Sequence, residues 1–112
     1  MWMMTDKGFF SVVRTEDGKL QARARERAHL AALQAAHPAL AKLPLLRTDR
    51  ADYRWRMVAP AEALVAAMAK EVEAINYGNF KDHCEKVAPG NRTLYVDALH
   101  AVWSIMRRLQ RP

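Results

Sequence analysis

The sequence predicts one α+β domain over residues 1–112, a small antiparallel sheet of three or four strands with helices packed on one face. Three observations favour this class. Asp17-Gly18 separates two segments rich in β-forming residues. Apolar and charged residues alternate over residues 52–58, and two later segments carry apolar residues at helical spacing. The elements are expected in the order β-β-α-β-α-α, with a further short helix between the last two.

A β-hairpin is expected first. Residues 2–14 read as a first strand or hairpin arm, because they contain many aromatic and β-branched side chains. Residues 9–14 then pair with residues 19–25 in antiparallel fashion. The Asp17-Gly18 dipeptide between them is typical of tight hairpin turns.

A helix follows over residues 26–36, where alanines are frequent and Leu30 and Leu33 share one face. Pro38 ends this helix, because the residue before a proline avoids the helical region. The segment 38–51 is therefore expected to be a connecting loop, which its leucines pin to the core.

The second half of the chain is expected to contain a strand at 52–58 and helices at 60–75, 80–87 and 92–110. Pro60 suits the first turn of a helix because its φ is preset. One stripe of the last helix is predicted to face the core. Its members are Leu94, Ala98, Val102, Ile105 and Leu109.

The chain is basic, with a formal net charge of +6 and a pI of about 9.9. A positive charge favours anionic partners, since neutralising phosphates releases condensed counterions. The alternative is compositional bias, because arginine outnumbers lysine and alanine is abundant, as a GC-rich genome would produce. The composition leaves both interpretations open.

Several classes of function lack a sequence signal. No apolar run is long enough for a membrane span, and the N-terminus does not read as a signal peptide. With Cys84 as the single cysteine an internal disulfide is excluded, so we expect a reducing cytoplasm. The four histidines show no metal-ligand spacing, and no phosphate-binding or nucleophile motif is present. We therefore expect no cofactor, no metal and no catalytic residue.

Two segments with alternating arginines are the strongest functional hint. In Gln21–Arg25 and Tyr53–Met57 the period of two sends arginines to one side of each strand and apolar residues to the other. Tyr53, Trp55 and Met57 are then expected to point into the core. If the strands share a sheet, the opposite side becomes a cationic face. Its members are Arg23, Arg25, Arg54 and Arg56.

Such a face would suit nucleic acid or another polyanion, because guanidinium groups bind phosphate through planar forks. Lys81 is added as a further contact, and Phe9 or Phe10 would supply a stacking surface. The inward aromatics of the 52–58 strand leave the face otherwise poor in stacking groups. The competing interpretation is a solvated sheet face whose arginines pair with nearby acids.

A second function remains open. Trp2 and Trp103 are candidate anchors for a protein partner, which would make the chain an adaptor or inhibitor, or a homodimer. Trp103 lies at the edge of the predicted apolar stripe of the last helix. There a tryptophan either widens the core contact or anchors a partner.

Motifs in a fixed order along nearly the whole chain resemble a widespread family of small bacterial proteins. They are Trp2-Met-Met-Thr5, Lys7-Gly-Phe-Phe-Ser-Val-Val13, Gln21-Ala-Arg-Ala-Arg25, Asp52-Tyr-Arg-Trp-Arg56, Ile75-Asn-Tyr-Gly-Asn-Phe-Lys81 and Val102-Trp-Ser-Ile-Met106. The resemblance implies a free-standing bacterial or phage-borne protein. It brings no established activity, so it adds no catalytic residue. This chain departs from the pattern at Asn76 and Gly78, where an acidic residue or a proline is expected.

Overall fold

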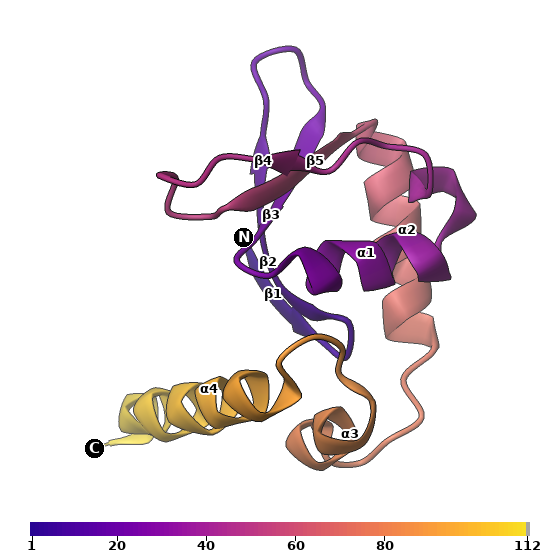
Figure 1. Ribbon diagram of the computed structural model, residues 1–112. Helices are drawn as coiled ribbons and strands as arrows, with labels where there is room; N and C mark the ends of the chain where they lie inside the picture. Colours follow the sequence, from indigo (N-terminus) through magenta and orange to yellow (C-terminus); the bar gives the residue numbers. More distant parts are fainter. Residues whose placement is uncertain (112) are drawn as a thin grey trace.

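The computed structural model describes residues 1–111 and confirms the α+β class (Figure 1). A five-stranded sheet has the order β1-β2-β3-β5-β4, with every neighbouring pair antiparallel. The strands are β1 (Trp2–Thr5), β2 (Gly8–Arg14), β3 (Leu20–Ala24), β4 (Leu46–Arg47) and β5 (Trp55–Ala59). The helices are α1 (Arg27–Ala36), α2 (Ala61–Glu73), α3 (Phe80–Val87) and α4 (Arg92–Met106), with short 3₁₀ turns at Pro38–Leu40 and Arg107–Gln110.

The sheet has more strands than the three or four predicted, because residues 2–14 form two strands instead of one. A turn at Asp6-Lys7 folds β1 back on β2, with Trp2 opposite Ser11. The Thr5 hydroxyl holds this turn by accepting from the Lys7 amide and donating to the Gly8 carbonyl. β4 is the other addition, a two-residue strand paired with the start of β5.

The hairpin predicted across Asp17-Gly18 is present. Arg14 pairs with Leu20 and Ser11 with Arg23, and Gly18 takes a positive φ of 84°. That conformation is open to glycine but strained for other residues. The register is the one that places Phe10 and Val12 on one side of the sheet and Ser11 on the other.

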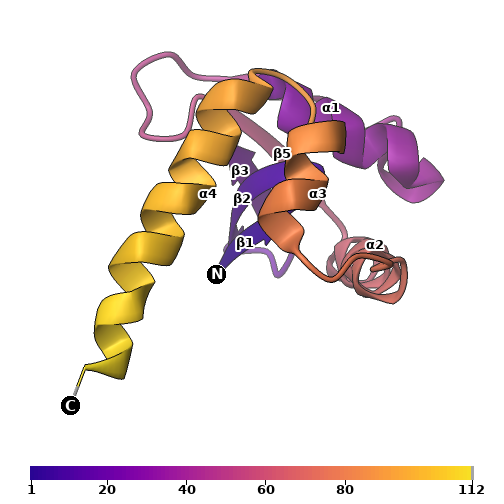
Figure 2. The same cartoon turned by 90° about the horizontal axis from the view of Figure 1, so that it is seen from below.

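The inner face of the sheet is covered by α1 and α2, which lie on the same side of the strands (Figure 2). Phe10, Ala22, Ala24 and Met57 project from this face and are fully buried. Across from them are the fully buried leucines of α1 and the following 3₁₀ turn. These are Leu30, Leu33 and Leu40. Each such side chain contributes about 1.5–3 kcal/mol to folding, so this layer is the main core.

The outer face of the sheet carries the alternate residues, and part of it is covered by the α3–α4 pair. Met4 and Phe9 pack there against Cys84, Tyr95 and Leu99. Figure 2 shows α4 across the sheet from α1 and α2. Helices therefore lie on both faces, in place of the single covered face that the sequence predicts. The difference arises because Met4 and Phe9 give β1 and β2 a second apolar side.

α4 does not bury the stripe that was predicted to face the core. Tyr95, Val96 and Leu99 are its buried residues, whereas Leu94 and Leu109 are exposed to solvent. The Tyr95 hydroxyl donates to the Thr5 carbonyl at 2.7 Å and fixes the first turns of the helix on the sheet. Beyond them α4 projects away from the body, so nothing covers its C-terminal half (Figures 1 and 2).

Candidate functional site

The antiparallel register of β3 and β5 brings the predicted arginines together on the outer face. Arg23 lies directly opposite Arg56. Arg25 immediately follows β3 and Arg54 immediately precedes β5, so both extend the same row. We call these four residues the arginine face. The expectation that the two strands share a sheet is thus met, because they are direct neighbours in it.

Tyr53 lies with the arginines and not in the core with Met57, contrary to the prediction. The guanidinium carbons of Arg23 and Arg25 are 4.6 and 4.3 Å from the centre of its ring. Tyr53 is only 7% exposed, because these two side chains cover it. The alternation fails here because β5 begins at Trp55, so Tyr53 belongs to the preceding loop.

Aromatic rings continue from Tyr53 across the sheet towards β1. The Phe9 ring centre is 6.3 Å from that of Tyr53, and the Trp2 ring meets Phe9 edge-on at 5.7 Å. Arg25 also lies over Phe9, at 5.9 Å. The outer face is therefore richer in stacking groups than the sequence predicts. Phe10, the other candidate, is buried on the inner face.

Each arginine has a polar neighbour that holds it in place. Arg23 donates to the Ser11 hydroxyl at 2.7 Å, and Arg56 donates to the Thr48 hydroxyl at 2.6 Å. The remaining two pair with acids of the β4–β5 loop: Arg25 with Asp52 at 3.1 Å and Arg54 with Asp49 at 3.8 Å. These ion pairs are exposed, so solvent screens them and they hold the arginines only weakly.

Lys81 does not belong to the arginine face. Its ammonium lies 5.1 Å from the ring centre of Trp103, and the Arg107 guanidinium lies 5.2 Å from the same ring. Lys81 and Trp103 therefore meet each other on the α3–α4 pair. Trp2, the other predicted anchor, is 68% exposed beside Phe9. The two tryptophans thus lie on different elements with different surroundings.

A chain of charged groups joins the β1–β2 turn to three helices, and sequence analysis did not find it. The Lys7 ammonium bridges Asp6 and Glu71 at 2.9 and 3.2 Å. His37 contacts Glu71 at 2.7 Å, and His83 contacts Asp6 at 2.9 Å. The members come from distant parts of the sequence, so no spacing signal exists. Only Asp6-Lys7 is a local pair.

Pairing among these charged groups shifts the pKa values of Asp6 and Lys7 more than burial does. Burial alone would raise the pKa of Asp6, but hydrogen bonds from His83 and Lys7 hold that pKa below its usual value. Burial likewise opposes the charged form of Lys7, yet its bonds to Asp6 and Glu71 raise its pKa. Both groups are therefore held in their charged forms at neutral pH.

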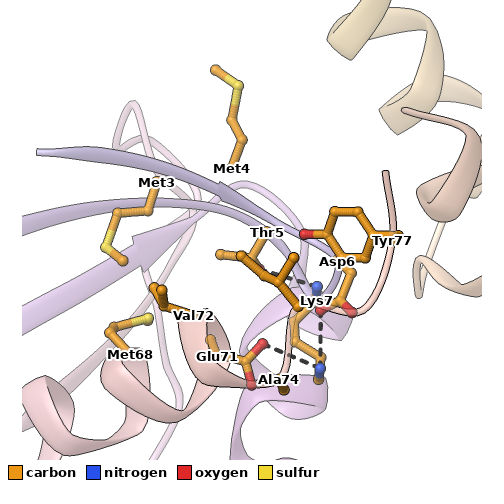
Figure 3. Close-up of a pocket in the computed structure, with 11 residues that line it drawn as sticks. Met3, Met4, Thr5, Asp6, Lys7, Met68, Glu71, Val72, Ala74 and Tyr77 are labelled. Atoms are coloured by element: carbon orange, nitrogen blue, oxygen red, sulfur yellow. Dashed lines mark hydrogen bonds and ion pairs between the residues drawn. The ribbon is translucent and has the colours of Figure 1, made fainter. Parts of the chain in front are cut away.

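A small pocket of about 190 Å³ lies beside these charged groups (Figure 3). Met3, Met68 and Val72 form its apolar side, and Lys7 with Glu71 forms its polar side. Lys7 pairs with both Asp6 and Glu71, so the charged groups on the polar side are already engaged with one another. This geometry suits a structural joint between the turn and α2.

The one thiol of the chain is poorly placed to act as a nucleophile. Cys84 is fully buried, and burial raises the pKa of its thiol to about 11, so little thiolate forms at neutral pH. Residues 1–111 contain no group of three or more His, Cys, Asp or Glu side chains able to hold a metal ion. None of the described helices is long and apolar enough to cross a membrane.

Comparison of the chain with protein-family models, with curated proteins and with solved structures finds no match. Any function must therefore be argued from the site itself.

Proposed function

We propose that the outer sheet face binds a polyanion, and that single-stranded nucleic acid fits it best. The observation that carries this proposal is the stacking of Arg23 and Arg25 on Tyr53, in line with Phe9 and Trp2. Single-stranded nucleic acid offers both phosphates for guanidinium groups and bases for aromatic rings. The net charge of +6 would steer such a ligand towards the protein.

The four arginines would bind the ligand in two different ways. Arg23 and Arg56 are fixed by hydroxyl groups, so they are preorganised and lose little freedom on binding. Arg25 and Arg54 are more than half exposed, and a phosphate would replace the carboxylates of Asp52 and Asp49. A base would then stack on Trp2, whose indole is largely uncovered.

The test is fluorescence anisotropy with a labelled single-stranded oligonucleotide, between roughly 50 and 200 mM salt. The double variant Arg25→Ala/Arg54→Ala should weaken binding at least tenfold at low salt. Its slope of log K against log salt should fall by about 1.4, because two phosphates of the single strand would no longer be neutralised.

The matched control is Lys42→Ala/Lys86→Ala, which removes the same charge from exposed positions outside the sheet. It should change affinity much less than the arginine variant. Equal reductions of affinity in both variants would mean that only the net charge attracts the oligonucleotide. An absence of binding by the wild type at the lowest salt would overturn the proposal.

A protein partner is the second candidate function, favoured by the exposure of Trp2 at the edge of the outer face. Trp103 is the weaker anchor, since Lys81 and Arg107 lie over its ring. An adaptor of this kind would bind with little dependence on salt and would lose affinity in Trp2→Ala. A reducing cytoplasm is the setting we propose for either function, because the one thiol, Cys84, is unpaired and buried.

A further inference from the structure

An apolar groove runs between α4 and the outer sheet face. Its volume is about 500 Å³. Trp2 and Phe9 line it from the sheet, and Leu94, Ala98 and Val102 line it from the N-terminal two thirds of α4. An apolar groove rimmed by polar side chains, here Arg25, Glu26 and His29, is typical of a surface that binds another molecule.

The C-terminal part of α4 and the 3₁₀ turn that follows it show the opposite feature, an apolar projection. Ile105 and Met106 are each 55% exposed and Leu109 is 81% exposed. This part extends beyond the body of the molecule, where it covers nothing (Figure 2). One helix thus carries a hollow apolar surface near its start and a protruding apolar surface near its end.

We propose that the occupant of the groove is α4 of a second copy of this chain, packed antiparallel to the first about a two-fold axis. The axis passes near Ala101 and Val102, the middle of the apolar stripe. Ile105 of each copy then lies beside the small Ala98 of the other. Large side chains meet small ones, and the same patch serves both copies, as a two-fold interface requires.

Charge selects the antiparallel arrangement. Arg107, Arg108 and Arg111 cluster at the C-terminal end of the helix, so a parallel pair would bring six arginines together. The 15 residues of α4 span about 22 Å, well beyond the screening length of about 8 Å at physiological salt. The antiparallel pair therefore keeps the two basic ends apart and places each beside the groove of the other copy, whose lining includes Glu26 as well as Arg25.

The groove and the projection supply large apolar side chains for such a pair. A standard interface buries about 800 Å² on each partner, and a large aromatic side chain alone buries roughly 150–250 Å². The groove and the projection together offer several side chains that are at least half exposed. They are Trp2, Leu94, Ile105, Met106 and Leu109. Trp2, Phe9 and Arg25 line the groove and also belong to the outer face, so a paired α4 would cover part of the proposed polyanion surface; pairing is therefore measured without nucleic acid.

Sedimentation analysis from about 1 to about 200 μM protein tests the proposal, because a dimer responds to concentration. The wild type should change from monomer to dimer within this range. Ile105→Glu should raise the dissociation constant at least tenfold, since it places a charge in the seam. The neighbouring variant Ser104→Glu, on the opposite side of the helix, should leave dimerisation unchanged. Circular dichroism of both variants separates loss of pairing from loss of folding.

Cross-linking gives a second test that does not require a destabilising substitution. Val102→Cys should form a disulfide-linked dimer under mild oxidation because the residue lies at the proposed axis. Ser104→Cys should not, and the buried Cys84 supplies little background. A wild type that remains monomeric at the highest concentration, or equal cross-linking through both engineered cysteines, would overturn the proposal.

Discussion

Side chains alternate between the two faces of the sheet, and those on the inner face are buried more deeply than those on the outer face. On the inner face Phe10, Ala22 and Met57 are fully buried beneath α1 and α2. On the outer face Phe9 and Arg23 remain partly exposed, because α4 covers only one end. The inner face therefore supplies most of the stability. Because the outer face contributes less to stability, its residues can serve binding instead.

The largest expected effect concerns the closest approach on the inner side. Gly8 has a φ of 136°, and a Cβ atom there would lie 2.1 Å from Cγ of His29. Gly8→Ala should lower the free energy of unfolding by about 4 kcal/mol or prevent folding, because backbone strain and a buried clash combine. Urea denaturation measures this. Gly78→Ala, where a Cβ meets open space, should stay within about 0.5 kcal/mol of wild type.

Truncating leucines on the two sides of the molecule should destabilise it unequally. Leu33→Ala removes a fully buried side chain beneath the inner face and should lower stability by about 2–5 kcal/mol. Leu94→Ala removes a side chain that is 64% exposed on α4, so the monomer should be destabilised by less than about 0.5 kcal/mol. Thermal or urea unfolding at low protein concentration compares them. Similar effects would show that α4 buries its stripe after all.

A smaller effect should appear on acidification. Burial lowers the pKa of His29, and the nearby Glu26 carboxylate opposes this shift only in part. The unfolded chain therefore takes up this proton first as the pH falls through about 6.5, so stability should decline from there until the folded pKa is reached. Unfolding midpoints measured between about pH 7.5 and 5 should fall less steeply in His29→Gln than in the wild type. Equal slopes would exclude His29 as the cause.

Local patterns predicted the elements whose signals lie within a few residues. The Asp17-Gly18 hairpin and the helix at 80–87 are present as expected, the latter starting at an Asn79 side chain that accepts from the Asp82 amide. The Asp6-Lys7 turn was missed although turns favour aspartate and glycine, because the β-forming residues on both sides of Asp6 and Gly8 were interpreted as one strand or hairpin arm. Its stability comes from the Thr5 hydroxyl and from Glu71, which no local pattern reveals.

Features that depend on tertiary geometry were harder to predict. Strand alternation predicted that Arg23 and Arg56 would share a face if their strands shared a sheet, but not that they would be paired. The position of Tyr53 was not predicted, because it depends on where β5 begins. The prediction of which side of α4 is buried was wrong for a related reason. An apolar stripe identifies the face that water disfavours, but the angle at which a helix leaves the sheet decides which part of that face is covered.

The hydrogen bonds that hold the α3–α4 pair connect residues remote in sequence, and this has a consequence for the order of folding. Tyr95 to Thr5 spans 90 positions, His83 to Asp6 spans 77, and Asn91 to Glu26 spans 65. Closing such large loops is entropically unfavourable until the early hairpins have formed. The C-terminal pair should therefore dock last and open first. Its amide hydrogens should exchange through partial opening while those of β2 and β3 wait for global unfolding.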